Sequence, residues 1–285
     1  MVNSPKVLIT GIEGFTGYHL KKHLDEYGFK PIGLQGDILD TESVFSQISK
    51  IKPNYIIHLA GISYAANDDI VSIYNTNIKG TLNILDAVKN VKQIPKKIIL
   101  ASSATIYGDS KNLINEETKV KPINHYGCSK LSMEFLSQTY FNDMPIIISR
   151  PFNYSGLYHD KRFLIPKIIH AYKNNLAEVE LGNLNISREF NDIRDVVNIY
   201  RLLLDSNAYS DTINICSGKS VKLLQLISKM NHISKHNIKV VMNKNFIRKS
   251  DIDDLSGDPS KLQSTINYSF KYKIQETLRW MYEND

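Results

Sequence analysis

The amino-acid sequence predicts an α/β fold in which a doubly wound parallel sheet carries helices on both faces. Three observations predict it: short apolar runs alternate with longer amphipathic segments, a glycine-rich turn follows the first apolar run, and the alternation weakens after Pro151. The 285-residue chain is 42% hydrophobic and 22% charged, which is the balance of an ordinary globular protein. We therefore expect one large domain with a smaller lobe.

The apolar runs of the first half have the length and the β-rich composition of buried strands. They lie at 6–10, 30–34, 55–60, 96–102 and 145–150, with helix-like segments at 17–28, 75–90 and 126–141. Beyond Pro151, further helices are expected near 163–175 and 221–233, whereas 245–260 is polar and turn-rich. We predict a nucleotide-binding domain at 1–150, to which later segments such as 188–216 return, and a smaller α/β substrate-binding lobe at 151–285.

The composition argues against several other classes of protein. The net charge is +6, but the basic residues are scattered and cluster only in pairs, so we expect no nucleic-acid partner. No apolar run reaches the roughly 18 residues of a membrane span, and the first strand begins too early to leave room for a signal peptide. Two cysteines, Cys128 and Cys216, are too few for a disulfide framework or a cysteine-rich metal site. We expect a cytoplasmic protein with no bound metal.

The stretch VLITGIEGFTG places Gly11, Gly14 and Gly17 between the first strand and the first helix. Glycine is required where a chain turns tightly, where its backbone approaches a pyrophosphate and where a helix packs closely on a strand. The helix that follows offers unpaired N–H groups and the positive end of its dipole to phosphate oxygens. The turn therefore predicts a nucleotide-binding site.

The G-x-x-G-x-x-G spacing after Thr10 resembles the extended short-chain dehydrogenase/reductase family, in its nucleotide-sugar branch of NAD-dependent epimerases and dehydratases. Seven further segments carry the resemblance over nearly the whole chain: GDILD at 36–40, HLAG at 58–61, NTNIKGT at 75–81, SSATIYG at 102–108, RPFNYSG at 150–156, RFLIP at 162–166 and REFNDIRDVV at 188–197. The resemblance implies a Rossmann-type sheet, NADPH or NADH as cofactor, a nucleotide-diphosphate sugar as substrate, a homodimer and a role in making lipopolysaccharide precursors.

The resemblance also implies which residues contact the cofactor. Asp37 and Ile38 would lie beside the adenine, and Asn77 occupies the position of a structural asparagine. Gln35 stands where an acid that binds the ribose 2′-hydroxyl of NAD is expected, so we expect weak discrimination between NADPH and NADH. The complete predicted set is Gly11, Gly14, Phe15, Thr16, Gly17, Gln35, Asp37, Ile38, Leu59, Ala60, Gly61, Asn77, Tyr126 and Lys130.

A tyrosine four residues before a lysine marks the expected catalytic site, but the pattern occurs three times. The pairs are Tyr18 with Lys22, Tyr107 with Lys111, and Tyr126 with Lys130. Only Tyr126 opens a helix and follows a hydroxyl-bearing strand end, Ser103, by 23 residues. Residues four apart on a helix project from one face and can share a ligand. We therefore select Tyr126 and Lys130.

By the resemblance, Tyr126 is the general acid of ketone reduction. A free phenol has a pKa near 10, and we expect the Lys130 ammonium and a positively charged nicotinamide to lower it. Lys130 would also hold the nicotinamide ribose. Ser103 would bind the substrate oxygen and stabilise its developing charge.

The substrate-binding residues are expected in the second half, apart from Thr105, which either touches the sugar or only packs. Asn153 would reach the sugar or diphosphate, Arg162 and Arg188 would lie by the diphosphate, and Arg248 with Asp251 would hold phosphate and ribose. The alternative for each arginine is an ordinary solvated side chain. His58, Arg150 and Arg194 are expected to be structural.

The class of chemistry is narrowed by residues that are missing. The related 4,6-dehydratases carry an Asp-Glu pair where this chain has Ala104 and Thr105. The epimerase-reductases carry a cysteine and a histidine where this chain has Thr105 and Phe163. The remaining resemblance is to 4-keto reductases of GDP-linked 6-deoxyhexoses, which would convert GDP-4-keto-6-deoxy-D-mannose to GDP-D-rhamnose. A dTDP-, CDP- or UDP-linked substrate, a 4-epimerase or dehydratase with tightly bound NAD, and a non-catalytic Rossmann sensor are the alternatives.

Overall fold

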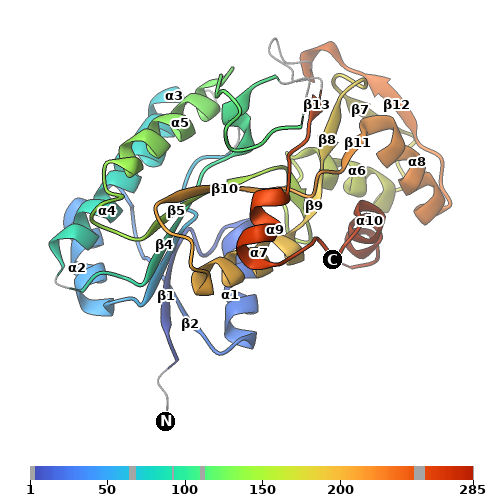
Figure 1. Cartoon of the computed structure of the whole chain (residues 1–285). Helices are drawn as coiled ribbons and strands as arrows, with labels where there is room; N and C mark the ends of the chain where they lie inside the picture. The colour runs from blue at the N-terminus through green and yellow to red at the C-terminus, as the bar shows by residue number, and fades with distance from the viewer. Residues whose placement is uncertain (1–3, 64–68, 92, 110–112, 247–253, 285) are drawn as a thin grey trace.

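The computed structural model describes residues 4–63, 69–91, 93–109, 113–246 and 254–284 (Figure 1). Its centre is a six-stranded sheet of order β10-β5-β4-β3-β1-β2, in which every pairing is parallel. The strands are β1 (Lys6–Thr10), β2 (Lys30–Gly33), β3 (Tyr55–His58), β4 (Lys97–Ala101), β5 (Ile146–Pro151) and β10 (Asp211–Ile215). The predicted doubly wound α/β fold is confirmed, and each of the five predicted strands lies where the sequence indicated.

Helices cover both faces of this sheet because its buried strands present apolar side chains alternately to each side. Val7 and Ile9 pack against α1 (Phe15–Glu26) and α7 (Ile193–Asp205). Leu8, between them, faces the opposite core, which is built by α2 (Thr41–Ile51), α4 (Gly80–Asn90) and α5 (His125–Gln138). Figure 1 shows these two layers on either side of the strands. The division into domains at residue 150 stays a prediction. Strand β10, which joins the large sheet, lies within 188–216, the range that the sequence predicts to return to the first domain.

The later residues build a smaller α/β region beside the carboxyl ends of the strands (Figure 1). Its own core lies among α6 (Leu164–Lys173), α8 (Leu223–Ser234) and α10 (Ile274–Glu283). Three small sheets accompany these helices: β11-β8-β13, β12-β7 and β6-β9. Their strands are β6 (Tyr154–Ser155), β7 (Glu178–Leu181), β8 (Ser187–Glu189), β9 (Asn191–Asp192), β11 (Ser220–Lys222), β12 (Lys239–Met242) and β13 (Asp254–Leu255).

The remaining elements are short, and several were not expected from the sequence. They are α3 (Ile70–Tyr74), a π-helix η1 (Asn75–Lys79), the 3₁₀ turns η2 (Ala104–Tyr107) and η3 (Lys244–Phe246), and α9 (Ser260–Ile266). Helix α2 was also missed, although Asp40 caps it by accepting a hydrogen bond from the Ser43 N–H over 3.0 Å. Helices α6 and α8 match their predicted ranges closely.

A buried ion pair joins α5 to the sheet. Arg150, at the end of β5, donates from Nε and Nη2 to the two carboxylate oxygens of Glu134, at 3.0 Å and 2.6 Å. The Glu134 side chain is 1% exposed and that of Arg150 is 8% exposed. Arg150 also donates to the Tyr107 hydroxyl at 2.7 Å, and that hydroxyl donates to Asn214 on β10. Arg150 and Tyr107 therefore connect α5, β5, η2 and β10, which agrees with the structural role expected for Arg150.

Replacing Glu134 by glutamine should lower the free energy of unfolding by about 3 kcal/mol, because the Arg150 guanidinium would stay buried without a compensating charge. Urea denaturation followed by circular dichroism measures the change. The matched control is Asp143→Asn, which breaks the exposed pair between Asp143 and Lys89 and should change stability little. Equal losses in the two variants would contradict a special contribution from the buried pair.

Candidate active site

A cleft of about 930 Å³ lies between the carboxyl ends of the central strands and the smaller region. This is where parallel α/β sheets bind ligands. Its wall combines the glycine turn, the loops after β3 and β4, the start of α5 and the segment 151–165. Fourteen of the predicted site residues line it: Gly11, Gly14, Phe15, Thr16, Gly17, Leu59, Gly61, Ser103, Thr105, Tyr126, Lys130, Asn153, Arg162 and Arg188.

The glycine turn has the geometry of a phosphate cradle. Gly11 has a φ of +69°, and a side chain at Gly17 would place its Cβ 2.2 Å from the Gly11 carbonyl oxygen. Helix α1 begins after Gly14 with no side-chain cap, so the N–H groups of its first turn are available to a ligand. The turn therefore fits the diphosphate of a dinucleotide.

The Ser102 hydroxyl, directly after β4, supports the same fit. It is buried at the cleft surface, and no side chain or backbone group of the described residues forms a hydrogen bond with it. Buried hydroxyl groups are normally paired, which indicates a place for a polar ligand atom. The sequence carries no separate signal for Ser102 beyond its place at the strand end.

The loop after β3 is held by a buried chain of hydrogen bonds through His58. Its Nδ1 lies 2.7 Å from the Thr10 hydroxyl and its Nε2 2.8 Å from the Thr81 hydroxyl. Thr10 also accepts from the Ala60 N–H at 3.0 Å. Burial first, and Lys130 second, lower the pKa of His58 to about 3, so it is neutral. His58 and Ala60 are outside the cleft lining and shape the loop that carries Leu59 and Gly61.

Asn77 occupies the π-helix η1 and contacts the site only through other residues. Its side-chain oxygen accepts from the Ile62 N–H at 2.9 Å, and its amide donates to the Ser129 hydroxyl at 2.9 Å. A side chain at Gly61 would place Cβ 2.7 Å from Asn77 Oδ1 and 3.3 Å from Lys130 Nζ. Asn77 thus joins the cofactor loop to α5, in keeping with its structural position, and does not line the cleft.

The start of α5 brings Tyr126 and Lys130 to the cleft. Asn124 caps this helix by accepting from the Gly127 N–H at 2.8 Å. The Lys130 ammonium donates to the Ala101 carbonyl at the end of β4, at 2.7 Å. Ser103 follows that strand, and its hydroxyl is the hydrogen-bond partner of Tyr126 and accepts from Thr105 Oγ1 at 2.8 Å. The structure therefore brings together the three residues that the sequence selected.

The pKa values of this pair differ from the sequence-based expectation. Burial raises the pKa of Tyr126 to about 12, and the hydrogen bond with Ser103 lowers it only in part. Lys130 is not among the causes. Burial also lowers the pKa of Lys130 to about 8, against the opposing influence of Glu134. The expected lowering of the Tyr126 pKa is wrong for the protein alone, because desolvation of the phenolate raises the pKa by more than the Ser103 hydrogen bond lowers it.

The other two Tyr-x-x-x-Lys pairs have different environments. Tyr107 is 1% exposed and lies in the Arg150 network, away from the cleft; its partner Lys111 lies outside the described residues. Tyr18 is 47% exposed on α1. Among the three tyrosines, Tyr126 alone lines the cleft.

The predicted substrate residues fall into two groups. Asn153, Arg162 and Arg188 line the cleft, Arg162 beside Asp160 with a 3.0 Å ion pair and Arg188 half-buried on β8. Thr105 also lines it and is hydrogen-bonded to Ser103. Arg248 and Asp251 lie outside the described residues.

Asp37 and Ile38, predicted beside the adenine, and Gln35, predicted at the ribose 2′-hydroxyl, lie after β2, outside the cleft lining. Gln35 is exposed, and Asp37 is exposed and accepts from the Leu39 N–H at 2.9 Å. Ile38 is 8% exposed and packs against α4 at Gly80. Ile38 therefore belongs to the core beneath this edge, while Gln35 and Asp37 are accessible to a ligand.

Several residues at the cleft were not anticipated. The Tyr154 hydroxyl lies 2.8 Å from Thr16 Oγ1, and His159 stacks between Phe15 and Phe163 at 4.1 Å and 4.4 Å. The contacts of Thr16 with Tyr154 and of Phe15 with His159 join residues more than a hundred positions apart, so no local sequence pattern predicts them. Arg194, expected to be structural, pairs with Asp192.

No metal site or membrane span is found in the part of the chain that the structure describes. No group of three or more His, Cys, Asp or Glu side chains there could hold a metal ion. None of the described helices has both the length and the apolar composition needed to cross a membrane.

Comparisons with known proteins agree with this geometry. The family described as GDP-mannose 4,6 dehydratase matches residues 30–281. A GDP-6-deoxy-D-talose 4-dehydrogenase of Aggregatibacter actinomycetemcomitans is 32% identical, over 98% of this chain and 97% of its own. A GDP-6-deoxy-D-mannose reductase of Pseudomonas aeruginosa is 28% identical, over 96% of this chain and 95% of its own.

A solved structure with the same fold was obtained with a bound dinucleotide cofactor. The structure of RMD from Pseudomonas aeruginosa, complexed with NADPH, superimposes with a TM-score of 0.89 and 26% identity, over 98% of both chains. The glycine cradle and the Ser102 hydroxyl fit such a dinucleotide in this chain. The chain therefore belongs to the GDP-mannose 4,6 dehydratase family within the extended short-chain dehydrogenases/reductases, and it is an NAD(P)-dependent oxidoreductase that acts on a CH–OH group.

Proposed function

We propose that this enzyme reduces the 4-keto group of GDP-4-keto-6-deoxy-D-mannose. The observation that carries the proposal is the placement of Ser103, Tyr126 and Lys130 in one cleft with the dinucleotide cradle. Arg162 and Arg188, on the other wall of that cleft, are suited to the diphosphate because a guanidinium matches phosphate oxygens. The similarity to two enzymes named for GDP-6-deoxyhexoses supports GDP as the nucleotide.

Two products are compatible with this substrate, because reduction from either face of the ketone gives one of two C4 epimers. GDP-D-rhamnose is the product that the sequence indicated. GDP-6-deoxy-D-talose is the second candidate, favoured by the 32% identity to a GDP-6-deoxy-D-talose 4-dehydrogenase. The substrate, the cofactor and the catalytic residues are the same for both.

A reduced nicotinamide held beside Tyr126 and Lys130 would supply the hydride that the ketone carbon accepts. Tyr126 donates a proton to the ketone oxygen, and its raised pKa keeps the phenol protonated until that oxygen becomes basic. Ser103 donates a hydrogen bond to the same oxygen and stabilises its growing charge. Lys130, held by the Ala101 carbonyl, binds the nicotinamide ribose and supports the return of a proton to Tyr126.

The residues needed for dehydration or epimerisation are not at the expected positions. Ala104 is buried, and Thr105 is hydrogen-bonded to Ser103. A threonine hydroxyl is a very poor base, and the Phe163 ring has no exchangeable proton. His159 lies beside Phe163, but burial lowers its pKa to about 4, so it is a weak base. This favours a simple reductase over a dehydratase and over epimerisation at C3 or C5. A 4-epimerase would use the same Ser103, Tyr126 and Lys130, and the consumption of NAD(P)H distinguishes it.

The substrate assignment is tested with 4-keto-6-deoxyhexoses linked to GDP, dTDP, CDP and UDP, following the loss of NAD(P)H absorbance. We expect stoichiometric consumption of NAD(P)H and a kcat/KM for the GDP sugar at least tenfold above the others. A preference for another nucleotide would refute GDP, and turnover without consumption would favour an epimerase or dehydratase. NMR of the product distinguishes the two C4 epimers.

Tyr126→Phe should lower kcat by about 10²–10⁴-fold with cofactor affinity unchanged, because it removes only the donated proton. Steady-state kinetics and titration with NADPH measure the two quantities. Tyr18→Phe, on the exposed face of α1, is the matched control and should retain activity. Tyr107→Phe is a poorer control, because it removes a buried hydrogen bond to Asn214. Near wild-type turnover by Tyr126→Phe would show that the wrong pair was selected.

Cofactor preference depends on Gln35, which is exposed and carries no charge at the end of β2. We expect NADPH to be accepted at least as readily as NADH. Gln35→Asp should lower kcat/KM for NADPH at least tenfold, since a carboxylate repels the 2′-phosphate and accepts from a 2′-hydroxyl. A wild-type preference for NADH of more than about a hundredfold in kcat/KM, roughly 2.7 kcal/mol, would contradict this.

A further inference from the structure

His159 lies at the junction of the two halves of the cleft. Its ring is parallel to Phe15, the first residue of α1, with centroids 4.1 Å apart and planes 8° apart. On its other side it stacks against Phe163, which precedes α6, with centroids 4.4 Å apart. The imidazole is therefore clamped between the cofactor-binding turn and the segment that carries Arg162.

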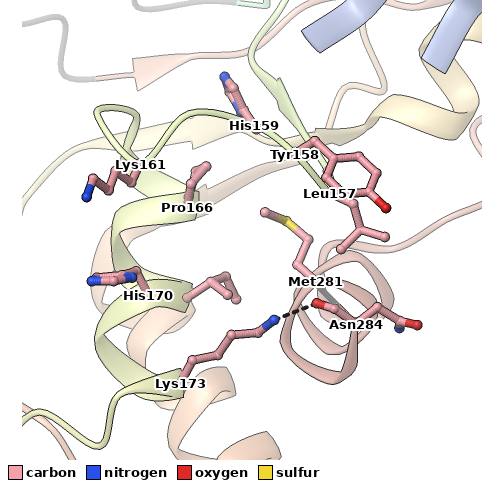
Figure 2. Close-up of a pocket in the computed structure, with 11 residues that line it drawn as sticks. Leu157, Tyr158, His159, Lys161, Pro166, His170, Lys173, Met281 and Asn284 are labelled. Atoms are coloured by element: carbon pink, nitrogen blue, oxygen red, sulfur yellow. Dashed lines mark hydrogen bonds between the residues drawn. The ribbon is translucent and has the colours of Figure 1, made fainter. Parts of the chain in front are cut away.

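The loop that carries His159 also separates two cavities. A smaller cavity of about 270 Å³ lies behind it, between α6 and α10. In Figure 2 the His159 ring extends away from Met281 and Asn284, which lie on the far side of this smaller cavity. Its Nδ1 lies 3.1 Å from the Ser155 hydroxyl. Nε2 is then the nitrogen that can serve a ligand in the main cleft.

We propose that His159 positions a diphosphate in the cleft by donating a hydrogen bond from its imidazole to a phosphate oxygen. Helix α1, on which it stacks, presents its N-terminus to the cofactor diphosphate. The sugar nucleotide would supply a second diphosphate to the same cleft, which Arg162 also lines. Both ligands offer the same group, a diphosphate. Binding experiments with the cofactor and with the sugar nucleotide separately show which of the two His159 contacts.

The environment of His159 links the proposed hydrogen bond to a phosphate oxygen with protonation of the imidazole. Its pKa is lowered to about 4, by burial first, with Asp160 raising it and His19 lowering it further. The charged or titratable groups around it are His19 on α1, Asp160, Lys161 and Arg162 in the loop, and His170 and Lys173 on α6. A phosphate anion against the ring would raise this pKa, and the two aromatic faces would favour the imidazolium.

The direction in which ligand affinity changes with pH follows from the rise in the His159 pKa on binding. If the pKa is higher in the complex than in the free protein, the ligand binds more tightly as the pH falls, and the gain is lost as the pH rises through the pKa of the complex. His159→Gln keeps a donor but cannot titrate, and His159→Phe keeps the stacking but has no donor. The two variants thus separate the hydrogen bond, the proton and the packing.

The test measures dissociation constants by calorimetry for NADH and for GDP-mannose, at about pH 6 and about pH 8. Both are diphosphate diesters that keep the same charge over this range. For the ligand that His159 contacts, wild-type affinity should rise about fivefold at the lower pH and His159→Gln should change less than twofold. His159→Phe should also change less than twofold with pH, and at about pH 8 it should bind that ligand about tenfold more weakly than wild type. His170→Gln, at an exposed position on α6, is the control and should behave as wild type.

The NADH arm does not depend on the proposed substrate, whereas the GDP-mannose arm rests on it. A pH effect with NADH alone assigns the cofactor diphosphate, even if no GDP-linked ketone is reduced. An effect with GDP-mannose alone assigns the sugar nucleotide. The proposal is overturned if His159→Gln and wild type show the same pH dependence for both ligands, or if His159→Phe binds both as tightly as wild type.

Discussion

The buried pair of Glu134 and Arg150 is the interaction on which the arrangement of the site depends. Helix α5 places Tyr126, Lys130 and Glu134 at intervals of four residues, so all three project from one buried face. Glu134 is fixed by two hydrogen bonds to the end of β5, which sets the depth and rotation of the helix. Lys130 is fixed in turn by the end of β4. The pair thus links the sheet to the two proposed catalytic side chains, and Glu134 also favours the charged form of Lys130.

The cofactor side of the cleft depends on backbone shape more than on side-chain charge. The glycine turn brings backbone within a distance that no side chain would permit, while the buried His58 chain holds the loop opposite it. Asn77 joins that loop to α5. The two halves of the site are therefore mechanically connected, and displacement of α5 would disturb the cofactor loop as well as the catalytic pair.

The parts of the structure that could be predicted are those with a local signal. Continuous β-rich runs marked the central strands, and the glycine turn marked the cofactor site. Tyr126 could be chosen because a strand-end hydroxyl preceded it. The π-helix at Asn77 and the stack of Phe15 with His159 could not, because they depend on packing between distant segments. Helix α2 differs, because its Asp40 cap is a local signal. The Tyr126 pKa was misjudged because burial, the main cause of its rise, is a property of the folded chain.

The central claim is that the site reduces C4 and performs no acid–base chemistry at the neighbouring carbons. The most direct test runs the reaction in heavy water with NADPH and GDP-4-keto-6-deoxy-D-mannose, and reads the product by NMR. Because C4 receives hydrogen from the cofactor and Tyr126 supplies only the hydroxyl proton, the product should carry protium at C4 and no deuterium at C3 or C5 beyond an enzyme-free control. Deuterium at C3 or C5 that accumulates faster than in the control would contradict the account.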